Sequence, residues 1–150
     1  MGKGNFSTVY RSSKVSEPGS VFAVKLINIA NLREQKIEHL VGAEIEILKA
    51  ANHINVITCH DVFCDDTWCY IFTPFYDGGN LESHIRKTTL NETEMIPMIK
   101  DIFEGLHYLE KSKIIHRDIK AANIFIKGGR AVIADLGFAK YFKYFIYYFS

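Results

Sequence analysis

The side chains with the clearest chemical potential in this 150-residue chain lie between His116 and Asn123, with Asp135 a short hairpin further on. Asp118, Lys120 and Asn123 supply a carboxylate, an ammonium and an amide at close intervals. Carboxylate and amide oxygens suit Mg²⁺, which takes one or two protein groups together with phosphates and water. A well-placed carboxylate can also accept a proton from a reacting hydroxyl. The spacing therefore predicts a site that holds a nucleotide's metal ions beside a hydroxyl that must lose a proton.

Two upstream motifs could contact the phosphates of the same nucleotide. Gly2-Lys3-Gly4 can bring backbone N–H groups close to an anion, because glycine has no Cβ in the way. Taken alone, this motif is equally well interpreted as a glycine-bearing hairpin turn. Ala23 and Lys25 lie two residues apart in an apolar strand-like segment, so they share one face of that strand. A strand lysine is usually solvated, so this assignment depends on the residues around it.

Hydrophobic periodicity and turn residues predict the elements that must position these groups. An amphipathic helix is predicted over residues 33–50, and a second helix begins at Asn91, where Glu94 completes a capping box, and runs to Leu109. Gly128-Gly129 predicts a tight hairpin between two apolar strands. Further strands are expected at residues 7–13, 21–27, 56–62 and 68–72. This order of elements predicts an α+β fold.

Together these motifs resemble the eukaryotic protein kinase family, and a lysine two residues after Asp118 is typical of its Ser/Thr branch. The resemblance implies an amino-terminal β-sheet lobe with one regulatory helix, followed by the first part of an incomplete helical lobe, truncated after Asp135-Leu136-Gly137. The implied boundaries are residues 1–73 for the first lobe, 74–79 for the hinge, 80–140 for the partial second lobe and 141–150 for an atypical tail. Ser7 replaces the family's third loop glycine, and Leu136 replaces its usual phenylalanine.

The resemblance implies four catalytic side chains. Asp118 would accept the substrate proton, and Lys120 would neutralise charge on the transferring phosphoryl group. Lys25 would bind phosphate and pair with Glu44, which lies 19 residues further along on the predicted helix. Glu46 points about 200° away around that helix and cannot serve the same role. The implied metal ligands are Asn123 and Asp135.

The resemblance also implies a set of ATP-binding residues: Gly2, Gly4, Val9, Ala23, Lys25, Thr73, Pro74, Tyr76 and Phe125. Thr73 would be the gatekeeper, and a side chain of its size leaves space behind the adenine. Pro74 and Tyr76 would offer backbone contacts to the adenine. Proline has no N–H, but the family uses the carbonyl at that position, so Pro74 is compatible.

Composition narrows the class of partners. The chain has 18 Lys and Arg residues against 17 Asp and Glu, so neither nucleic acid nor an anionic membrane is an expected partner. No apolar run reaches the roughly 18 residues of a membrane span, and no targeting segment is expected before Gly2. The spacing of Cys59, Cys64 and Cys69 fits neither a zinc site nor a disulfide framework, so we expect reduced thiols and a cytoplasmic protein.

The last ten residues are out of character, because seven of them are aromatic. They are interpreted either as a membrane-surface or partner-binding tail or, preferably, as the end of a truncated gene product or the read-through of sequence that is not normally translated. The apolar stripe of the helix ending at Leu109 would face helices that are absent here, so we expect low stability or aggregation of the isolated chain.

The predicted function is an ATP-dependent protein kinase that transfers the γ-phosphoryl group to Ser/Thr of an unidentified protein, with ATP and Mg²⁺ as cofactors. The alternative is an inactive, truncated kinase-like fragment that binds nucleotide or a partner protein.

Overall fold

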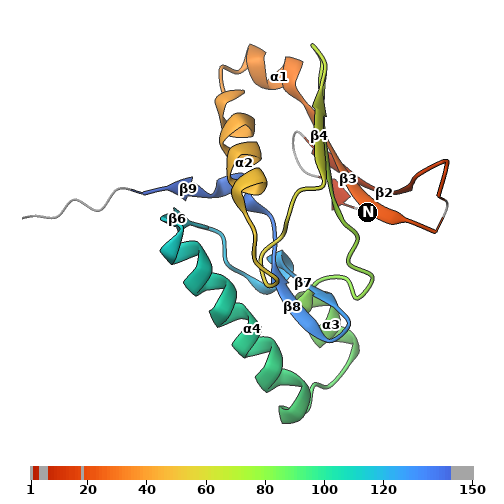
Figure 1. Ribbon diagram of the computed structural model, residues 1–150, viewed down its shortest axis with the longest axis vertical. Coiled ribbons are helices and arrows are strands. Elements are labelled where there is room, and N and C mark those ends of the chain that lie inside the picture. Colours follow the sequence, from red (N-terminus) through yellow and green to blue (C-terminus); the bar gives the residue numbers. More distant parts are fainter. Residues whose placement is uncertain (1, 4–6, 18, 143–150) are drawn as a thin grey trace, which may run out of the picture.

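The computed structural model describes residues 2–3, 7–17 and 19–142. One end of the molecule is an antiparallel sheet with the strand order β1-β2-β3-β5-β4 (Figure 1). Its strands are β1 (Gly2–Lys3), β2 (Ser7–Ser13), β3 (Val21–Asn28), β4 (Asp61–Cys64) and β5 (Trp68–Pro74). The strands predicted at residues 7–13, 21–27 and 68–72 are confirmed, and β5 extends two residues further than expected.

The strand predicted at residues 56–62 is wrong over most of its length. Val56 makes an isolated parallel bridge to Ile133, and the Ile57 N–H donates to the Ile133 carbonyl at 2.8 Å. Regular pairing begins only at Asp61. The apolar run therefore spans the junction between the two halves of the molecule, where burial in the core replaces pairing within the sheet.

Two helices replace the single helix predicted over residues 33–50. They are α1 (Ile29–Glu34), capped by the Asn28 side chain, and α2 (His39–Ala50). Lys36, between them, has a left-handed backbone with φ of 59°, which an α-helix cannot accommodate. The break frees α2 to pack its own buried face, which includes Glu44, against the sheet.

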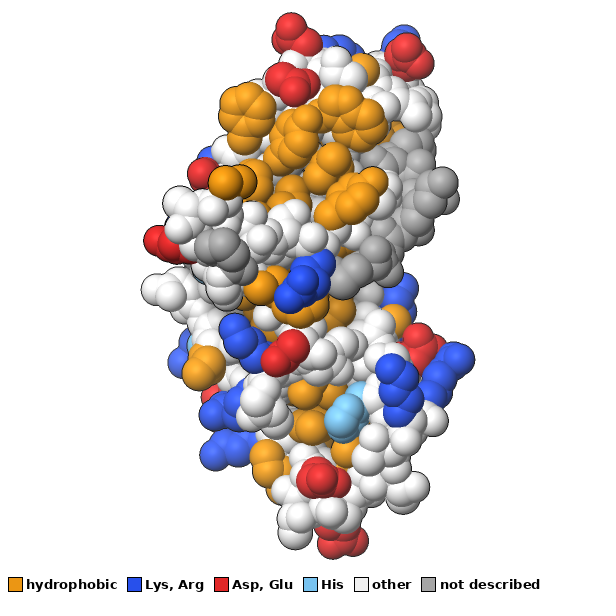
Figure 2. All heavy atoms as spheres, turned by 90° about the vertical axis from the view of Figure 1, so that its right-hand side faces the viewer, with side chains coloured by type: hydrophobic (Ala, Val, Ile, Leu, Met, Phe, Trp, Pro, Cys, Tyr) orange, Lys and Arg blue, Asp and Glu red, His pale blue; other side chains and the backbone are white. Residues whose placement is uncertain are grey.

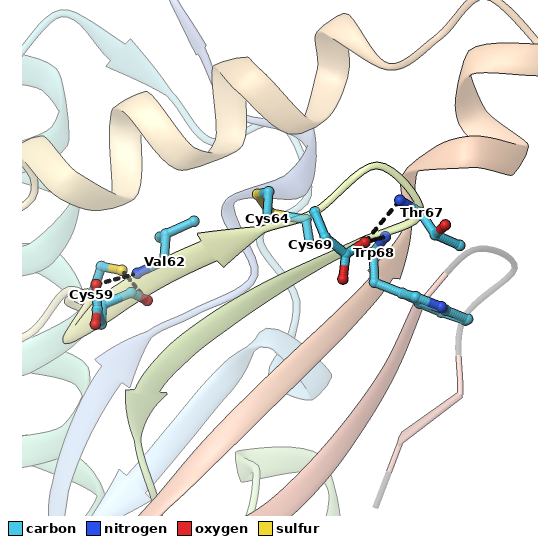
Figure 3. Close-up of a disulfide and its surroundings, with 8 residues drawn as sticks. Cys59, Val62, Cys64, Thr67, Trp68 and Cys69 are labelled. Atoms are coloured by element: carbon cyan, nitrogen blue, oxygen red, sulfur yellow. Dashed lines mark hydrogen bonds between the residues drawn. A yellow bond between two sulfur atoms is a disulfide. The ribbon is translucent and has the colours of Figure 1, made fainter.

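The expectation of reduced cysteines is wrong for two of the three. Cys64 and Cys69 are direct partners across the β4–β5 hairpin, and they form a disulfide (Figure 3). A hairpin places such residues side by side, which their spacing along the chain does not reveal. Cys59 is a free cysteine.

The opposite face of the sheet from α2 is rich in aromatic side chains. Phe22 and Phe72 pack with ring centroids 5.7 Å apart, and Phe63 and Tyr70 pack at 5.8 Å. Figure 2 shows hydrophobic side chains gathered on this part of the surface. The inner face, by contrast, supplies Ile27 and Ile71 to the core.

The other half of the molecule is built on α3 (Leu81–Lys87) and α4 (Glu92–Lys111). The predicted capping box of Asn91 and Glu94 is confirmed, and Pro97 lies inside α4. One side of α4 is buried through Met98, Asp101, Gly105 and Leu109. The other side is largely solvent-exposed, with exposed fractions of 61% for Ile96, 43% for Ile99 and 68% for Phe103. No helix among the described residues is both long and apolar enough to cross a membrane.

Short strands and turns connect this half to the sheet. β7 (Ile124–Lys127) and β8 (Arg130–Ile133) form the predicted hairpin, with φ of 56° and 75° at Gly128 and Gly129. Two short 3-10 helices, η1 (Ala121–Asn123) and η2 (Leu136–Phe138), flank that hairpin. β6 (Ile114–Ile115) pairs with β9 (Lys140–Tyr141), so the first residue of the expected tail belongs to a strand. The rest of that tail from residue 143 lies outside the described residues.

Candidate active site

Lys25 lies at the centre of an ion-pair cluster between the two halves of the molecule. Its Nζ is 2.5 Å from Glu44 Oε1 on α2 and 3.8 Å from Asp135 Oδ1 at the start of η2. Glu44 is only 6% exposed, so Lys25 is the cation that compensates a buried carboxylate. Asp135 is more open, with 45% of its side chain exposed. The cluster thus joins β3, α2 and η2 and leaves one carboxylate facing solvent.

The backbone around Asp135 is specialised for this arrangement. Asp135 itself has φ of 60°, in the left-handed region that Asp tolerates better than most residues. Gly137 follows two residues later, and a Cβ added there would lie 3.3 Å from Asp135 Oδ1 and 3.5 Å from Glu44 Oε2. A side chain at position 137 would therefore crowd the Asp135 carboxylate and contact that of Glu44.

A second cluster surrounds Asp118, in the loop before η1. Lys120 Nζ donates to Asp118 Oδ2 at 2.7 Å, and Asn123 Nδ2 donates to the same oxygen at 2.9 Å. The hydrogen bond from Lys120 is the main reason that the pKa of Asp118 is lowered, and it outweighs the opposite effect of burial. The same contact raises the pKa of Lys120. Asp118 is therefore held as a carboxylate and Lys120 as an ammonium.

His116 and Arg117 hold this loop in place. His116 is buried, and its Nε2 lies 2.9 Å from the Ala134 carbonyl while its Nδ1 accepts from the Asp118 N–H at 3.3 Å. This pair of contacts requires the tautomer with its proton on Nε2. Arg117 has φ of 68° and donates through Nε to the Phe138 carbonyl at 2.5 Å. Both side chains thus tie the Asp118 loop to the segment that carries Asp135.

The predicted hinge runs from the end of β5 toward α3. Thr73 pairs with Ala23 of β3, and the Tyr76 ring stacks on Phe125 of β7 at a centroid distance of 5.6 Å. Burial raises the pKa of Tyr76 to about 12. Glycine is required at position 78, where the hinge contacts β7, because an added Cβ would lie 2.6 Å from the Ile126 carbonyl oxygen. The hinge is therefore packed directly on β7.

The structure brings most of the predicted site residues to this junction. Val9 on β2 is the register partner of Lys25, and Asn123 on η1 lies against Asp118. Gly2 is in β1, opposite Val9. Gly4 lies outside the described residues, so its predicted phosphate contact remains a prediction.

Sequence reasoning missed the polar contacts that join α4 to β8. Arg130 forms a two-pronged contact with Asp101 of α4, with hydrogen bonds of 2.6 to 3.0 Å, and Asn55 donates to the Ala131 carbonyl at 2.9 Å. Burial raises the pKa of Asp101, but the hydrogen bonds from Arg130 and Ala131 outweigh that effect and lower it. The available signal was that Asp101 lies on the same side of the helix as Met98 and Leu109.

The side-chain oxygens at this junction could serve as ligands of a divalent cation that also binds phosphates. Asn123 uses its Nδ2 as the donor to Asp118, which leaves the amide oxygen available, and Asp135 offers an open carboxylate. Two protein oxygens are what Mg²⁺ takes when phosphates and water complete its shell. Among the described residues, no group of three or more His, Cys, Asp or Glu side chains could hold a metal by itself. The oxygens of Asn123 and Asp135 therefore suit a divalent cation whose other ligands come from outside the protein.

The family follows from a comparison with known proteins. A family model described as protein kinase domain matches residues 1–145, which is nearly the whole chain. The chain belongs to the protein kinase family.

The individual relatives are named as kinases, and one of them is named as a serine/threonine-protein kinase. Over 93% of its length, the chain is 32% identical to serine/threonine-protein kinase cds1 of Schizosaccharomyces pombe. It is 29% identical to calcium-dependent protein kinase 4 of Plasmodium berghei over 96% of its length, and 28% identical to aurora kinase C of Mus musculus over 93%. The chain spans only 32%, 28% and 51% of these three proteins, respectively.

Proposed function

We propose that this chain carries the nucleotide-binding and catalytic residues of a kinase that transfers the γ-phosphoryl group of ATP to Ser or Thr of a protein substrate. The observation that carries the proposal is the ion-pair cluster in which Lys25 contacts Glu44 at 2.5 Å and lies 3.8 Å from Asp135. In protein kinases this lysine–glutamate pair and the metal-binding aspartate must both be in place for catalysis. Three separate elements meet here in that arrangement.

Each polar group then has a distinct role. Lys25 would bind the α- and β-phosphates, while Asn123 and Asp135 would ligate Mg²⁺, which neutralises phosphate charge when bound. Asp118 would accept the proton of the substrate hydroxyl, because its lowered pKa keeps it ionised. Lys120 would stabilise negative charge on the transferring group. Asn123 also orients Asp118 through its Nδ2, so one side chain would couple the metal to the base.

The Ser/Thr preference is supported by two observations. Lys120 lies within hydrogen-bonding distance of Asp118 Oδ2, at 2.7 Å, which is where a Ser/Thr kinase places its lysine. One relative, cds1 of Schizosaccharomyces pombe, is named as a serine/threonine-protein kinase. The protein substrate itself is left open by this chemistry.

Phosphoryl transfer from γ-labelled ATP to a generic basic substrate tests the proposal, with the Asp118→Asn variant beside the wild-type chain. We expect the wild type to incorporate label and the variant to lose roughly 10²- to 10⁴-fold of the rate, as for the loss of a general base. Asp66→Asn, at an exposed position in the β4–β5 turn outside the site, is the matched control and should retain the wild-type rate. Equal incorporation by wild type and Asp118→Asn would contradict the assignment.

A nucleotide-binding or partner-binding fragment without transfer activity is the second candidate. The apolar side chains of Ile96, Ile99 and Phe103 on α4 are solvent-exposed, although such a stripe normally packs against another element. Stabilisation by Mg²⁺ and ATP without label transfer would favour this second function.

A further inference from the structure

The β4–β5 hairpin carries a pair of cysteines that the proposed kinase chemistry does not use. Cys64 and Cys69 are register partners at its closed end, five residues apart, and are joined as a disulfide (Figure 3). Their environments differ sharply, because Cys69 is fully buried whereas Cys64 is exposed. One cysteine of the bond is thus open to a solution thiol and the other is shielded by the core.

We propose that Cys64 and Cys69 form a reversible thiol–disulfide modification site that exchanges with the glutathione couple. In the reducing direction, a glutathione thiolate attacks the Cys64 sulfur and Cys69 leaves as a thiolate, which takes up a proton. A second glutathione then attacks the mixed disulfide, so that two glutathione molecules become glutathione disulfide and the protein gains two thiols. Oxidation reverses both steps. Glutathione is thus the reductant of this exchange and glutathione disulfide its oxidant.

The hairpin tip is hydrogen-bonded to the beginning of α1, so opening the disulfide would affect how this helix is held. The Thr67 carbonyl accepts the N–H groups of Ile29 at 2.9 Å and Ala30 at 3.3 Å. These are the first two residues of α1, whose N–H groups have no partner within the helix. Arg33 of α1 also donates to the Asp66 carbonyl at 3.4 Å. The disulfide closes the loop that presents both carbonyls.

The hairpin also lies against the helix that carries Glu44. Cys69 lies on the same face of β5 as Ile71, and both belong to one core with Ile47 and Leu48 of α2. α1 connects to α2 through four residues only. Loosening the tip would therefore release α1 first and then the connection into α2.

Cys59 provides an internal control. It is half-buried, and its Sγ lies 3.3 Å from the Asp61 carbonyl, away from the hairpin tip. Burial raises the pKa of the Cys59 thiol and so lowers its thiolate fraction. It should stay a thiol under conditions that oxidise the other two cysteines.

Alkylation of the full chain in buffers of defined glutathione ratio, read by intact mass and peptide mapping, tests the site. We expect three alkylated cysteines under reduced glutathione and one, Cys59, under glutathione disulfide, with full return on re-reduction. The Cys59→Ser variant should show two alkylated cysteines under reduced glutathione and none under glutathione disulfide. Three alkylated cysteines at every ratio, or a bond involving Cys59, would overturn the proposal. This test uses no nucleotide, so its outcome is independent of the kinase assignment.

Amide hydrogen exchange then tests whether the Cys64–Cys69 disulfide stabilises the beginning of α1. Closing a six-residue loop favours the ordered form by up to roughly 40-fold, so reduction should accelerate exchange at Ile29 and Ala30 by about 10- to 40-fold. Amides of β3 that lie away from the hairpin tip, such as that of Ala23, should not change. The Cys64→Ser variant should match the reduced wild type in both redox buffers. Identical exchange at Ile29 and Ala30 in the oxidised and reduced wild type would refute a structural role for the bond.

Discussion

At the scale of single residues, the site depends on how Asp118 is kept ionised. Its Oδ2 accepts from both Lys120 and Asn123, and the hydrogen bond from the Lys120 ammonium is the largest cause of the lowered pKa. A carboxylate with a lowered pKa stays deprotonated, and able to act as a base, until the pH falls through that lowered value. The pairing with Lys120 therefore extends the working range of Asp118 toward acid.

Replacing Lys120 by methionine should raise the pKa of Asp118 toward its ordinary value of about 3.9, because the main cause of the shift is removed. Carboxyl-carbon NMR titration of Asp118 measures this pKa directly. Lys127→Met, an exposed residue at the far end of β7, is the charge-matched control and should leave the titration unchanged. If the pKa stayed the same in Lys120→Met, the assigned hydrogen bond would be wrong.

The resemblance of the motifs to the protein kinase family selected Lys25, Glu44 and Asp135, and these side chains do meet in the folded chain. Helical geometry shows that Glu44 and Glu46 cannot serve the same role, and the register of the family motif favoured Glu44. The double hydrogen bond on Asp118 could not be predicted, because side-chain rotamers are set by packing that spacing does not describe. Gly137 was seen only as part of a motif, and its closeness to two carboxylates depends on the folded backbone.

At the scale of elements, two helical glycines should respond to the same substitution with opposite sign. Gly42 in α2 has no atom within 4 Å of an added Cβ, so Gly42→Ala should stabilise the chain by about 0.5–1 kcal/mol. In α4, the Cβ of Gly105→Ala would lie 2.7 Å from the Asn55 carbonyl oxygen and 2.8 Å from Ile133 Cδ1. Overpacking of about 1–3 kcal/mol should outweigh the helical gain there.

Urea denaturation of the two variants beside the wild type measures both changes in the free energy of unfolding. Equal stabilisation by the two substitutions would mean that α4 does not pack on β8 as described.

Elements whose ends are marked by capping or turn residues could be predicted from the sequence. Elements whose ends are set by tertiary packing could not. The capping box at Asn91 and the hairpin at Gly128-Gly129 are local chemistry, and both are confirmed. The break at Lys36 carries no glycine or proline, so periodicity alone extended the helix across it. The pairing of Cys64 with Cys69 likewise depends on the hairpin register.

At the scale of the whole molecule, the uneven burial of α4 has a measurable consequence. Phe103 is 68% exposed, whereas Leu109 on the same helix is 2% exposed. Phe103→Ser should change the free energy of unfolding by less than about 0.5 kcal/mol, as for an exposed site, and should reduce self-association.

Leu109→Ser, the matched buried variant, should cost about 2–5 kcal/mol as a large-to-small core change. Light scattering and denaturant titration of both variants separate association from stability. A large loss of stability in Phe103→Ser would show that this face of α4 is covered within the folded chain.

The most direct test of the account is whether Asp135 makes nucleotide binding depend on Mg²⁺. Thermal unfolding would be measured with ATP, with and without Mg²⁺, for the wild type and Asp135→Asn. Asparagine also tolerates the left-handed backbone at this position, so the variant removes the charge and keeps the fold. We predict stabilisation of the wild type by about 2.7 kcal/mol at a hundredfold excess over Kd, only with Mg²⁺, and its loss in Asp135→Asn. Equal stabilisation without Mg²⁺, or in Asp135→Asn, would contradict the proposed site.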